Sequence, residues 1–303
     1  MPGRRCCGPS GWCDMANGIL IVDKPAGWTS HDVVAKLRGV FHEKRIGHAG
    51  TLDPMATGVL PVFVGRATRA VEFAAEREKE YIAGLRMGTV TDTQDVTGSV
   101  LETWPVSVGR EDVERVLDRF RGDILQIPPM YSAVKRNGKK LYELARRGEE
   151  VEREPRPITI YALELVEQVT ETDYILRVLC SKGTYVRTLC HDIGQALGCG
   201  GTLYSLRRTR AAGFDLSQAV TLEQVAGAEE PAALLLPVAS YFDCYPPLPL
   251  SDPESERRVK NGNPLVLEGE NGIYRVYGPD GAFLALSRLE NCRLTTIKSF
   301  FEV

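Results

Sequence analysis

The sequence predicts an α+β protein: a mixed, largely antiparallel central sheet flanked by helices and loops, followed by a small C-terminal β domain. Two observations lead to this fold class. Strand-like and helix-like segments succeed one another without the regular β-α-β rhythm of a parallel sheet, and some strand-like runs are spaced as hairpins. After an acidic, proline-rich stretch at 229–256, GIYRVYGPDGAFLALS shows two short strands around a Gly-Pro-Asp-Gly turn.

Residues 17–103 carry three strand signals and one helix signal. NGILIVDK ends at a turn rich in Pro and Gly and predicts a strand. Ser30 is expected to cap a helix with one apolar face, formed by Val33, Leu37, Val40 and Phe41. Residues 59–64 predict a buried strand. EYIAGLRMG predicts another, and we expect 81–87 to pair with 99–103 as a hairpin.

Residues 109–198 carry two helix signals and one strand signal. Between Gly109 and Gly122 the apolar residues recur at i, i+3, i+4 and i+7, which predicts an amphipathic helix. DYILRVLCS alternates in the manner of a strand. GTYVRTLCHDIGQALG has helical spacing, with Gly198 as the expected stop.

Length and composition suit a main domain and a smaller module. The chain has 303 residues, of which 43% are hydrophobic and 25% charged. We expect residues 1–14 to be a disordered extension or a consequence of start-site choice, 15–243 to form the main domain, and 244–303 to form a small domain that leans on it. The longest apolar run, near Leu235, is too short to cross a bilayer, so no membrane role is expected.

Charge and cysteine usage restrict the partners and the compartment. The net charge is −3, but residues 211–256 contain eight acidic and no basic residues, which leaves +5 for the rest of the chain. Residues 135–156 hold eight Lys or Arg against five Glu, a cluster that can grip phosphates but is also typical of a solvated face. Eight dispersed cysteines without a C-x-x-C pair favour reduced thiols in a cytosol.

One short stretch, RIGHAGTLDPMATGVLPVFVG, holds an aspartate in a tightly specified turn. Asp53 lies among glycines, which permit unusual backbone angles, and precedes Pro54, which fixes its own φ. Most aspartates before a proline are turn or cap residues. A carboxylate can also act as a nucleophile if a cation keeps it ionised, and the candidate cations are Arg187, Lys182 and Arg45. The four histidines form no metal-binding pattern, so no metal is expected.

Five motifs resemble those of a known enzyme family. They are GHAGTLDPMATGVLPVFVGRATR, KEYIAGLRMGTVTDTQDVTG, PPMYSAVKRNGKKLYELARRG, CSKGTYVRTLCHDIG and LRRTRAAGF. In this order they resemble the successive motifs of the TruB family of tRNA pseudouridine synthases, over about 18–214. The region after residue 244 is similar to the family's RNA-binding PUA domain. Two departures affect only loops: Arg69 replaces a common lysine, and Ala212 precedes Gly213 in place of a Gly-Pro ending.

The resemblance implies a reaction and roles for seven residues. The reaction is isomerisation of uridine 55 in the T-loop of tRNA to pseudouridine, with no cofactor, metal or obligatory protein partner, by a cytoplasmic monomer. Asp53 matches the nucleophile, which attacks C1′ or C6, and Arg187 matches its ion-pair partner. Tyr81 matches the tyrosine that stacks on the flipped base and helps to remove a proton. The substrate-binding positions are His48, which refills the base stack, Tyr185 and Leu206, which line the nucleotide pocket, and Lys24, near the phosphates. Residues 135–156 match an RNA-contacting thumb.

Each of these residues also has an ordinary structural reading, and three other functions compete. A strand tyrosine is usually core, and a helical arginine is usually exposed. The first rival is a non-catalytic tRNA-binding or tRNA-folding chaperone on the same scaffold. The second is a guide-RNA-dependent relative of the dyskerin type, which usually carries a larger C-terminal region. The third, cysteine-dependent uracil methylation through Cys180 or Cys190, lacks a glycine-rich donor loop.

Overall fold

A computed structural model describes residues 16–136 and 138–301, so the expected extension at 1–14 lies outside the described residues. The main sheet has nine strands. Its central path runs in the order β1 (Gly18–Lys24), β3 (Thr57–Val64), β12 (Gly201–Ala211), β4 (Lys79–Met87), β11 (Asp173–Cys180), β10 (Arg156–Gln168) and β7 (Gly122–Gln126). The short strands β2 (Ile46–His48) and β13 (Phe214–Asp215) pair with β3 and β12. Only β3 and β12 are parallel neighbours, so the predicted α+β class with a largely antiparallel sheet is confirmed.

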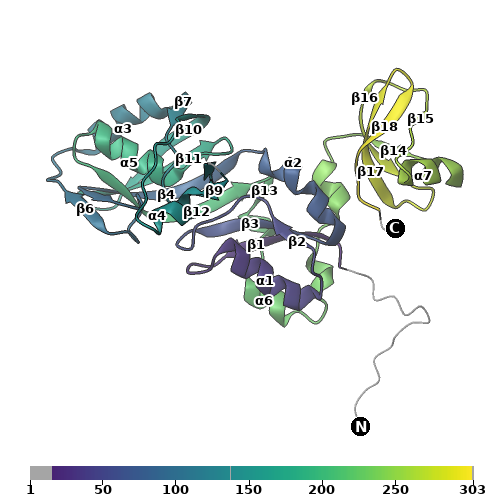
Figure 1. Cartoon of the computed structure of the whole chain (residues 1–303), viewed down its shortest axis with the longest axis horizontal. Helices are drawn as coiled ribbons and strands as arrows, with labels where there is room; N and C mark the ends of the chain where they lie inside the picture. The colour runs from purple at the N-terminus through teal and green to yellow at the C-terminus, as the bar shows by residue number, and fades with distance from the viewer. Residues whose placement is uncertain (1–15, 137, 302–303) are drawn as a thin grey trace, which may run out of the picture.

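Helices cover the sheet in two places (Figure 1). The helices α3 (Arg110–Leu117) and α5 (Val186–Ala196) pack on the β12-β4-β11-β10 part, and both keep their predicted apolar faces buried. The helices α1 (Ser30–Phe41) and α6 (Leu222–Gly227) share a second core with β1 and β3. A short helix, α2 (Val71–Ala75), follows β3. Since α5 begins at the same end of the sheet as the β2–β3 loop, the two segments can meet.

The helix cap that we predicted at Ser30 was assigned one residue too late. Thr29 is the N-cap of α1: its hydroxyl accepts a hydrogen bond from the Asp32 N–H, and Asp32 reciprocates toward the Thr29 N–H in a capping box. Both Thr29 and Ser30 are good cap residues, and the acidic residue three positions after Thr29 decides between them. Ser30 is free for another role, described below.

The hairpin predicted between 81–87 and 99–103 is wrong. The strand β6 (Val100–Thr103) pairs instead with β5 (Thr89–Thr91), in a separate two-stranded sheet. Gly88, with φ of 85°, turns the chain between β4 and β5. Both edges of β4 are already occupied by β11 and β12, so no edge remains for β6.

The basic segment at 135–156 projects as a small separate unit. It contains a short hairpin of β8 (Lys135–Arg136) and β9 (Lys139–Lys140), followed by α4 (Leu141–Ala145). Most of its charged side chains are exposed or half-buried. The segment therefore presents its cations to solvent.

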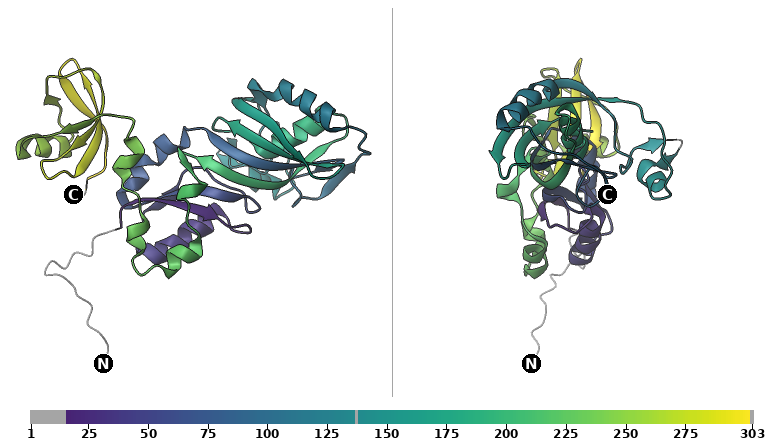
Figure 2. Two further views of the ribbon diagram at one scale, coloured as in Figure 1. Left: turned by 180° about the vertical axis from the view of Figure 1, so that it is seen from behind. Right: turned by 90° about the vertical axis from the view of Figure 1, so that its left-hand side faces the viewer.

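A second sheet lies at the C-terminal end of the chain, apart from the main sheet (Figures 1 and 2). Its order is β14 (Pro247–Pro249), β16 (Gly272–Tyr277), β17 (Phe283–Glu290), β18 (Arg293–Ser299) and β15 (Leu265–Val266), with α7 (Pro253–Lys260) beside it. The strand pair around the Gly-Pro-Asp-Gly turn, β16 with β17, is confirmed. The acidic, proline-rich composition of 229–256 is typical of a domain boundary or linker. In the structure this stretch is folded into short 3₁₀ turns, β14 and the start of α7.

Aromatic side chains join the two sheets. Phe242, just before the second sheet, contacts Phe73 of α2 on one side and Phe283 and Phe300 on the other, with ring centroids 5.4 to 6.2 Å apart. A salt bridge of 2.6 Å between Lys298 and Glu72 adds to this junction. The second sheet therefore shares an apolar core with the main body. Among the described residues, no helix combines the length and apolar character that crossing a bilayer requires.

Candidate active site

The loop between β2 and β3 carries Asp53 and is held on both sides of it. The buried Ser30 hydroxyl donates to the Leu52 carbonyl (3.2 Å) and accepts from the Leu52 N–H (2.9 Å). On the other side, the Gly27 N–H donates to the Pro54 carbonyl over 2.8 Å. These bonds fix the backbone directly before and after the aspartate. The rigid turn that the glycines and proline predicted is thus anchored by α1 and by the turn that precedes it.

Lys24 is one of these anchors. Its side chain is fully buried, and its ammonium donates to the carbonyls of Trp28 (2.7 Å), Pro25 (2.9 Å) and Pro54 (3.3 Å). Burial lowers the pKa of Lys24 to about 8, although the Asp53 carboxylate pulls it back up. The position near the phosphates implied by the resemblance requires an accessible ammonium. In this structure the ammonium is instead enclosed under the Asp53 loop.

Arg187 of α5 forms an ion pair with Asp53, with 2.9 Å between Nε and Oδ2. Arg187 is 6% exposed. The two other nitrogens of its guanidinium also have acceptors: Nη1 donates to the Thr93 carbonyl (3.0 Å) and Nη2 to the Tyr131 carbonyl (2.8 Å). Nη1 also lies 3.5 Å from Oδ2 of Asp95, a buried carboxylate. Because fixed acceptors hold the guanidinium, it in turn fixes the direction of the Asp53 carboxylate.

The Asp53 side chain remains 39% exposed although its Oδ2 is paired with Arg187. Burial raises the pKa of the Asp53 carboxyl above its ordinary value, and the Arg187 guanidinium opposes this shift. The two other candidate cations are engaged elsewhere. Lys182 pairs with Glu76, and Arg45 lies 3.8 Å from a carboxylate oxygen of Glu43.

Tyr81 and Leu206 lie on the neighbouring strands β4 and β12 and are 7% and 9% exposed. Both belong to the apolar cluster that also contains Leu52, the residue before Asp53. Burial raises the pKa of the Tyr81 phenol, so it is protonated at neutral pH. The cluster thus brings an aromatic and an aliphatic side chain to the aspartate loop.

Tyr185 is the N-cap of α5 and is held by a residue that the sequence analysis did not single out. The buried Gln126 side chain accepts from the Tyr185 N–H (2.8 Å) and donates to its carbonyl (3.1 Å). These two hydrogen bonds fix the start of α5, two residues before Arg187. Burial raises the pKa of the Tyr185 phenol, and the Asp53 charge contributes in the same direction, as expected for two neighbouring groups.

His48 lies at the end of β2 with its ring edge-on to His31, centroids 5.6 Å apart. Burial lowers the pKa of His48 to about 4, so the ring is neutral at physiological pH. A neutral, half-buried aromatic ring suits a group that stacks with bases. Between residues 16 and 301, with 137 left aside, no group of three or more His, Cys, Asp or Glu side chains is arranged to hold a metal ion.

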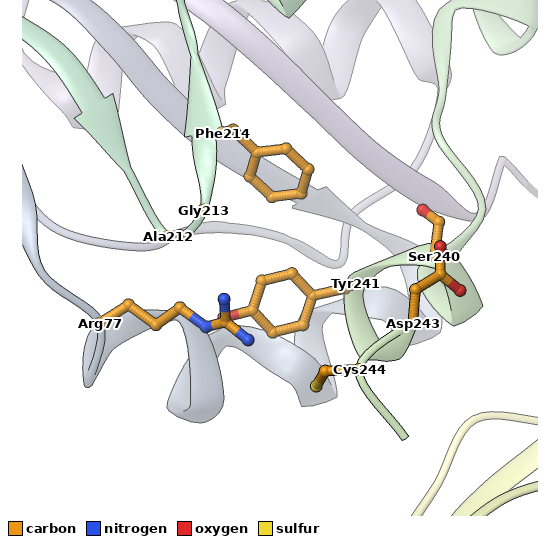
Figure 3. A pocket seen from close by; sticks show the side chains of 8 residues that line it. All are labelled: Arg77, Ala212, Gly213, Phe214, Ser240, Tyr241, Asp243 and Cys244. Carbon is orange, nitrogen blue, oxygen red and sulfur yellow. The ribbon is translucent and has the colours of Figure 1, made fainter. Parts of the chain in front are cut away.

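Three residues of the site escaped the sequence analysis: Ser30 as a loop anchor, Gln126 and Asp95. Asp95 accepts hydrogen bonds from Thr93 and Thr97 in the segment DTQDVTG. This segment belongs to one of the quoted motifs, but its proximity to Arg187 depends on a contact between distant segments. A cavity of about 200 Å³ lies elsewhere, lined by Arg77 and Tyr241 among others, and none of the seven predicted site residues borders it (Figure 3).

Comparisons with known proteins give one family for most of this chain. Residues 38–186 match the model of the TruB family pseudouridylate synthase N-terminal domain, and 187–242 match that of the tRNA pseudouridylate synthase B C-terminal domain. Two proteins named tRNA pseudouridine synthase B are close in sequence. That of Syntrophotalea carbinolica is 49% identical over 298 residues, covering 95% of this chain and 96% of its own. That of Stutzerimonas stutzeri is 46% identical over 282 residues, covering 90% and 92%.

A solved structure, of a Cbf5-Nop10-Gar1 complex, contains a chain with the same fold. Its TM-score is 0.70 at 26% identity, and the match covers 95% of this chain and 86% of that one. The matched family models and this fold define a pseudouridine synthase. The chain belongs to the TruB family.

Proposed function

We propose that this tRNA pseudouridine synthase acts on the uridine at position 55, in the T-loop of tRNA. The observation that carries the proposal is the 2.9 Å ion pair of Arg187 with Asp53, in a loop clamped by hydrogen bonds on both sides. The similar proteins named tRNA pseudouridine synthase B support the choice of tRNA.

In the proposed reaction the Asp53 carboxylate attacks either C1′ of the ribose or C6 of the uracil. The bond from C1′ to N1 breaks, the base turns within the site, and a bond forms between C5 and C1′. The C–O bond that Asp53 made to C1′ or C6 also breaks, which returns the carboxylate to its free form. The proton on C5 then leaves, and N1 gains one. Product and substrate are isomers, so the chemistry needs no redox partner or second substrate. Arg187 keeps the carboxylate oriented and favours its ionised form.

The uridine must leave the base stack before Asp53 can reach it. Extruding a base costs a few kcal/mol, which contacts to the extruded base and to the gap must offset. In our proposal Tyr81 stacks on the base, Tyr185 and Leu206 line its pocket, and the neutral His48 ring fills the vacated position. Lys24 acts by holding the Asp53 loop rather than by contacting a phosphate, because its ammonium is buried.

The remaining RNA contacts are assigned to two regions. The cation-rich segment 135–156 is proposed to cover the T-arm as a thumb. Residues 244–303, with their separate five-stranded sheet, are proposed to form a PUA-like RNA-binding domain that follows a catalytic domain at 15–243.

The likeness to the Cbf5-Nop10-Gar1 complex favours a second candidate, a guide-RNA-dependent enzyme. Identity of 26% to that chain, against 49% to a protein named tRNA pseudouridine synthase B, makes us prefer the stand-alone enzyme. We propose a cytoplasmic monomer that needs no protein partner. A purely binding or folding role on the same scaffold is the third candidate.

Release of tritium from a T-arm stem-loop transcript labelled at C5 of uridine tests the proposal directly. The wild-type protein alone should release one equivalent per RNA, and chemical labelling should map pseudouridine to position 55. Asp53→Asn should bind the RNA as tightly and release nothing, whereas Asp123→Asn, an exposed isosteric control on β7, should behave as wild type. Turnover by Asp53→Asn would refute its role, and activity only with added guide RNA would favour the second candidate.

A further inference from the structure

Arg208 of β12 is an arginine in an unusual position. Its side chain is fully buried and is the largest in the described part of the chain to be so. Its strand neighbours Arg207 and Arg210 each pair with a carboxylate, but within the described residues no ion pair reaches Arg208. Burying a cation without a counter-charge is costly. Such a group is retained only where its hydrogen bonds or its charge are needed.

Two of its nitrogens hold the backbone on either side of Asp53. Nε donates to the Val59 carbonyl (2.7 Å) and Nη2 to the Gly50 carbonyl (3.0 Å). Two glycines make room for this arrangement. A Cβ on Gly50 would lie 3.3 Å from Nη1, and one on Gly58 would lie 2.2 Å from the Arg208 carbonyl oxygen. Gly58 therefore allows the close approach of the β12 backbone, and Gly50 leaves room for the guanidinium beside the loop.

The third nitrogen, Nη1, is buried and has no hydrogen-bond partner of good geometry. Tyr81 is the cross-strand partner of Arg208 in the antiparallel pair of β4 and β12, so the two side chains project from the same face. Burial raises the pKa of the Tyr81 phenol, and the charge of the Arg208 guanidinium opposes this shift. Because the two side chains share one face of the sheet, the phenol oxygen is the acceptor that we assign to Nη1.

We propose that Arg208 is a positioning residue for Tyr81: Nη1 donates to the phenol oxygen, which directs the phenol O–H into the catalytic pocket and favours its ionised form. The inference rests on the proposed function, because it acts through Tyr81. It adds a second task to the loop support: one guanidinium sets both the backbone before Asp53 and the acidity of the tyrosine. Arg208 itself has no exposed surface and does not touch the RNA.

The acidity of Tyr81 can be measured without RNA. The chain contains 11 tyrosines. Uniform labelling with 3,5-difluorotyrosine and comparison with Tyr81→Phe identifies the Tyr81 signal by fluorine NMR. In Arg208→Gln this signal should titrate about one pH unit or more higher than in the wild type, with a smaller rise in Arg208→Lys. The control Arg86→Gln, which removes an exposed arginine from the same sheet, should leave it unchanged.

A double-mutant cycle on the single-turnover rate provides the second readout. Arg208→Gln should slow the wild-type enzyme about 10-fold or more, but should slow Tyr81→Phe less than about 3-fold, because its partner is already absent. Equal slowing in both backgrounds, or a Tyr81 signal that does not move, would mean that Arg208 only supports the backbone and would overturn the inference.

The folded wild type also provides a test if the Gln variant unfolds. The titration of Tyr81 is then measured in Arg208→Lys instead. An unchanged titration in that variant would contradict the proposal. In a crystal structure of the wild type with the stem-loop, Nη1 should lie within hydrogen-bond distance of the phenol oxygen. A wider gap, or a wild-type Tyr81 that does not titrate before the protein unfolds, overturns the proposal. Failure of wild-type tritium release would instead refute the proposed function, which the titration does not test.

Discussion

At the scale of single residues, the role of Arg187 depends on the directions of its hydrogen bonds as well as on its charge. Its guanidinium contacts Asp53, Thr93 and Tyr131 at once, in three directions. A lysine at this position would keep the charge, but its single ammonium could not match acceptors that lie along different edges of a planar guanidinium. The planar geometry of the Arg187 guanidinium therefore matters more than its charge for the orientation of Asp53.

We accordingly expect Arg187→Lys to lower the single-turnover rate by about 10²-fold or more, because the carboxylate loses its fixed orientation. The loss should appear at saturating RNA, so that tighter binding cannot restore it. Arg86→Lys is the matched control, since Arg86 forms an exposed bidentate pair with Asp173. Arg187→Lys with a rate within threefold of the wild type would contradict the assignment.

The ionisation of Asp53 predicts the acid limb of the pH profile. The nucleophile must be deprotonated, and burial raises its pKa above the ordinary 3.8. The value of kcat/KM should therefore fall as pH is lowered, with an apparent pKa above that of a free aspartate. Since the folded state holds this proton more tightly than the unfolded state, the carboxyl lowers stability as pH rises through the same range. His48, with a pKa of about 4, should add no transition near neutrality.

Lys24 offers a test between anchoring and phosphate binding. Its ammonium is enclosed by three carbonyls, so Lys24→Met should slow turnover and lower the free energy of unfolding. The slope of log Kd for RNA against log salt concentration should not change, because no phosphate contact is lost. A slope reduced by about one unit would support the phosphate role implied by the family resemblance.

At the scale of elements, local sequence signals predicted the helices α1, α3 and α5 and several strands, but neither the long strands β10 and β12 nor the pairing partners. The faces of α3 and α5 followed from apolar spacing, and the β16–β17 pair from its turn. The pairing of β4 did not follow, because its neighbours β11 and β12 are about 90 and 120 residues away in the sequence. The same limit applies to the site. The motifs identified Asp53 and Arg187, whereas Gln126 and Arg208 gained roles only through distant contacts.

Gln126 tests how one such contact supports an element. Its side-chain amide accepts from the Tyr185 N–H and donates to the Tyr185 carbonyl, fixing the start of α5. Gln126→Ala should lower the free energy of unfolding by about 1–3 kcal/mol, because the Tyr185 N–H loses its acceptor. Turnover should fall too, through displacement of Arg187. Thermal unfolding and single-turnover rates should separate this variant from Gln168→Ala, an exposed control, and equal behaviour of the two would contradict the positioning role.

At the scale of the whole molecule, the two sheets are coupled by an aromatic junction rather than by a free linker. Phe300 is 2% exposed and its ring stacks on Phe283, with centroids 5.2 Å apart, while also contacting Phe242. Nearby, Arg77 lies over the Tyr241 ring at 5.3 Å (Figure 3). A rigid junction would hold the proposed RNA-binding sheet at a set position relative to Asp53.

Phe300→Ala tests this coupling without deleting any element. Removing the ring should cost about 3–5 kcal/mol of stability and loosen the C-terminal sheet. The dissociation constant for the T-arm at fixed salt should then rise more than the saturated single-turnover rate falls, because Asp53 and Arg187 are untouched. The neighbouring Phe301→Ala is the control, since Phe301 packs within the core of the C-terminal sheet itself. If both variants bind RNA as the wild type does, the fixed position of the second sheet does not contribute to binding.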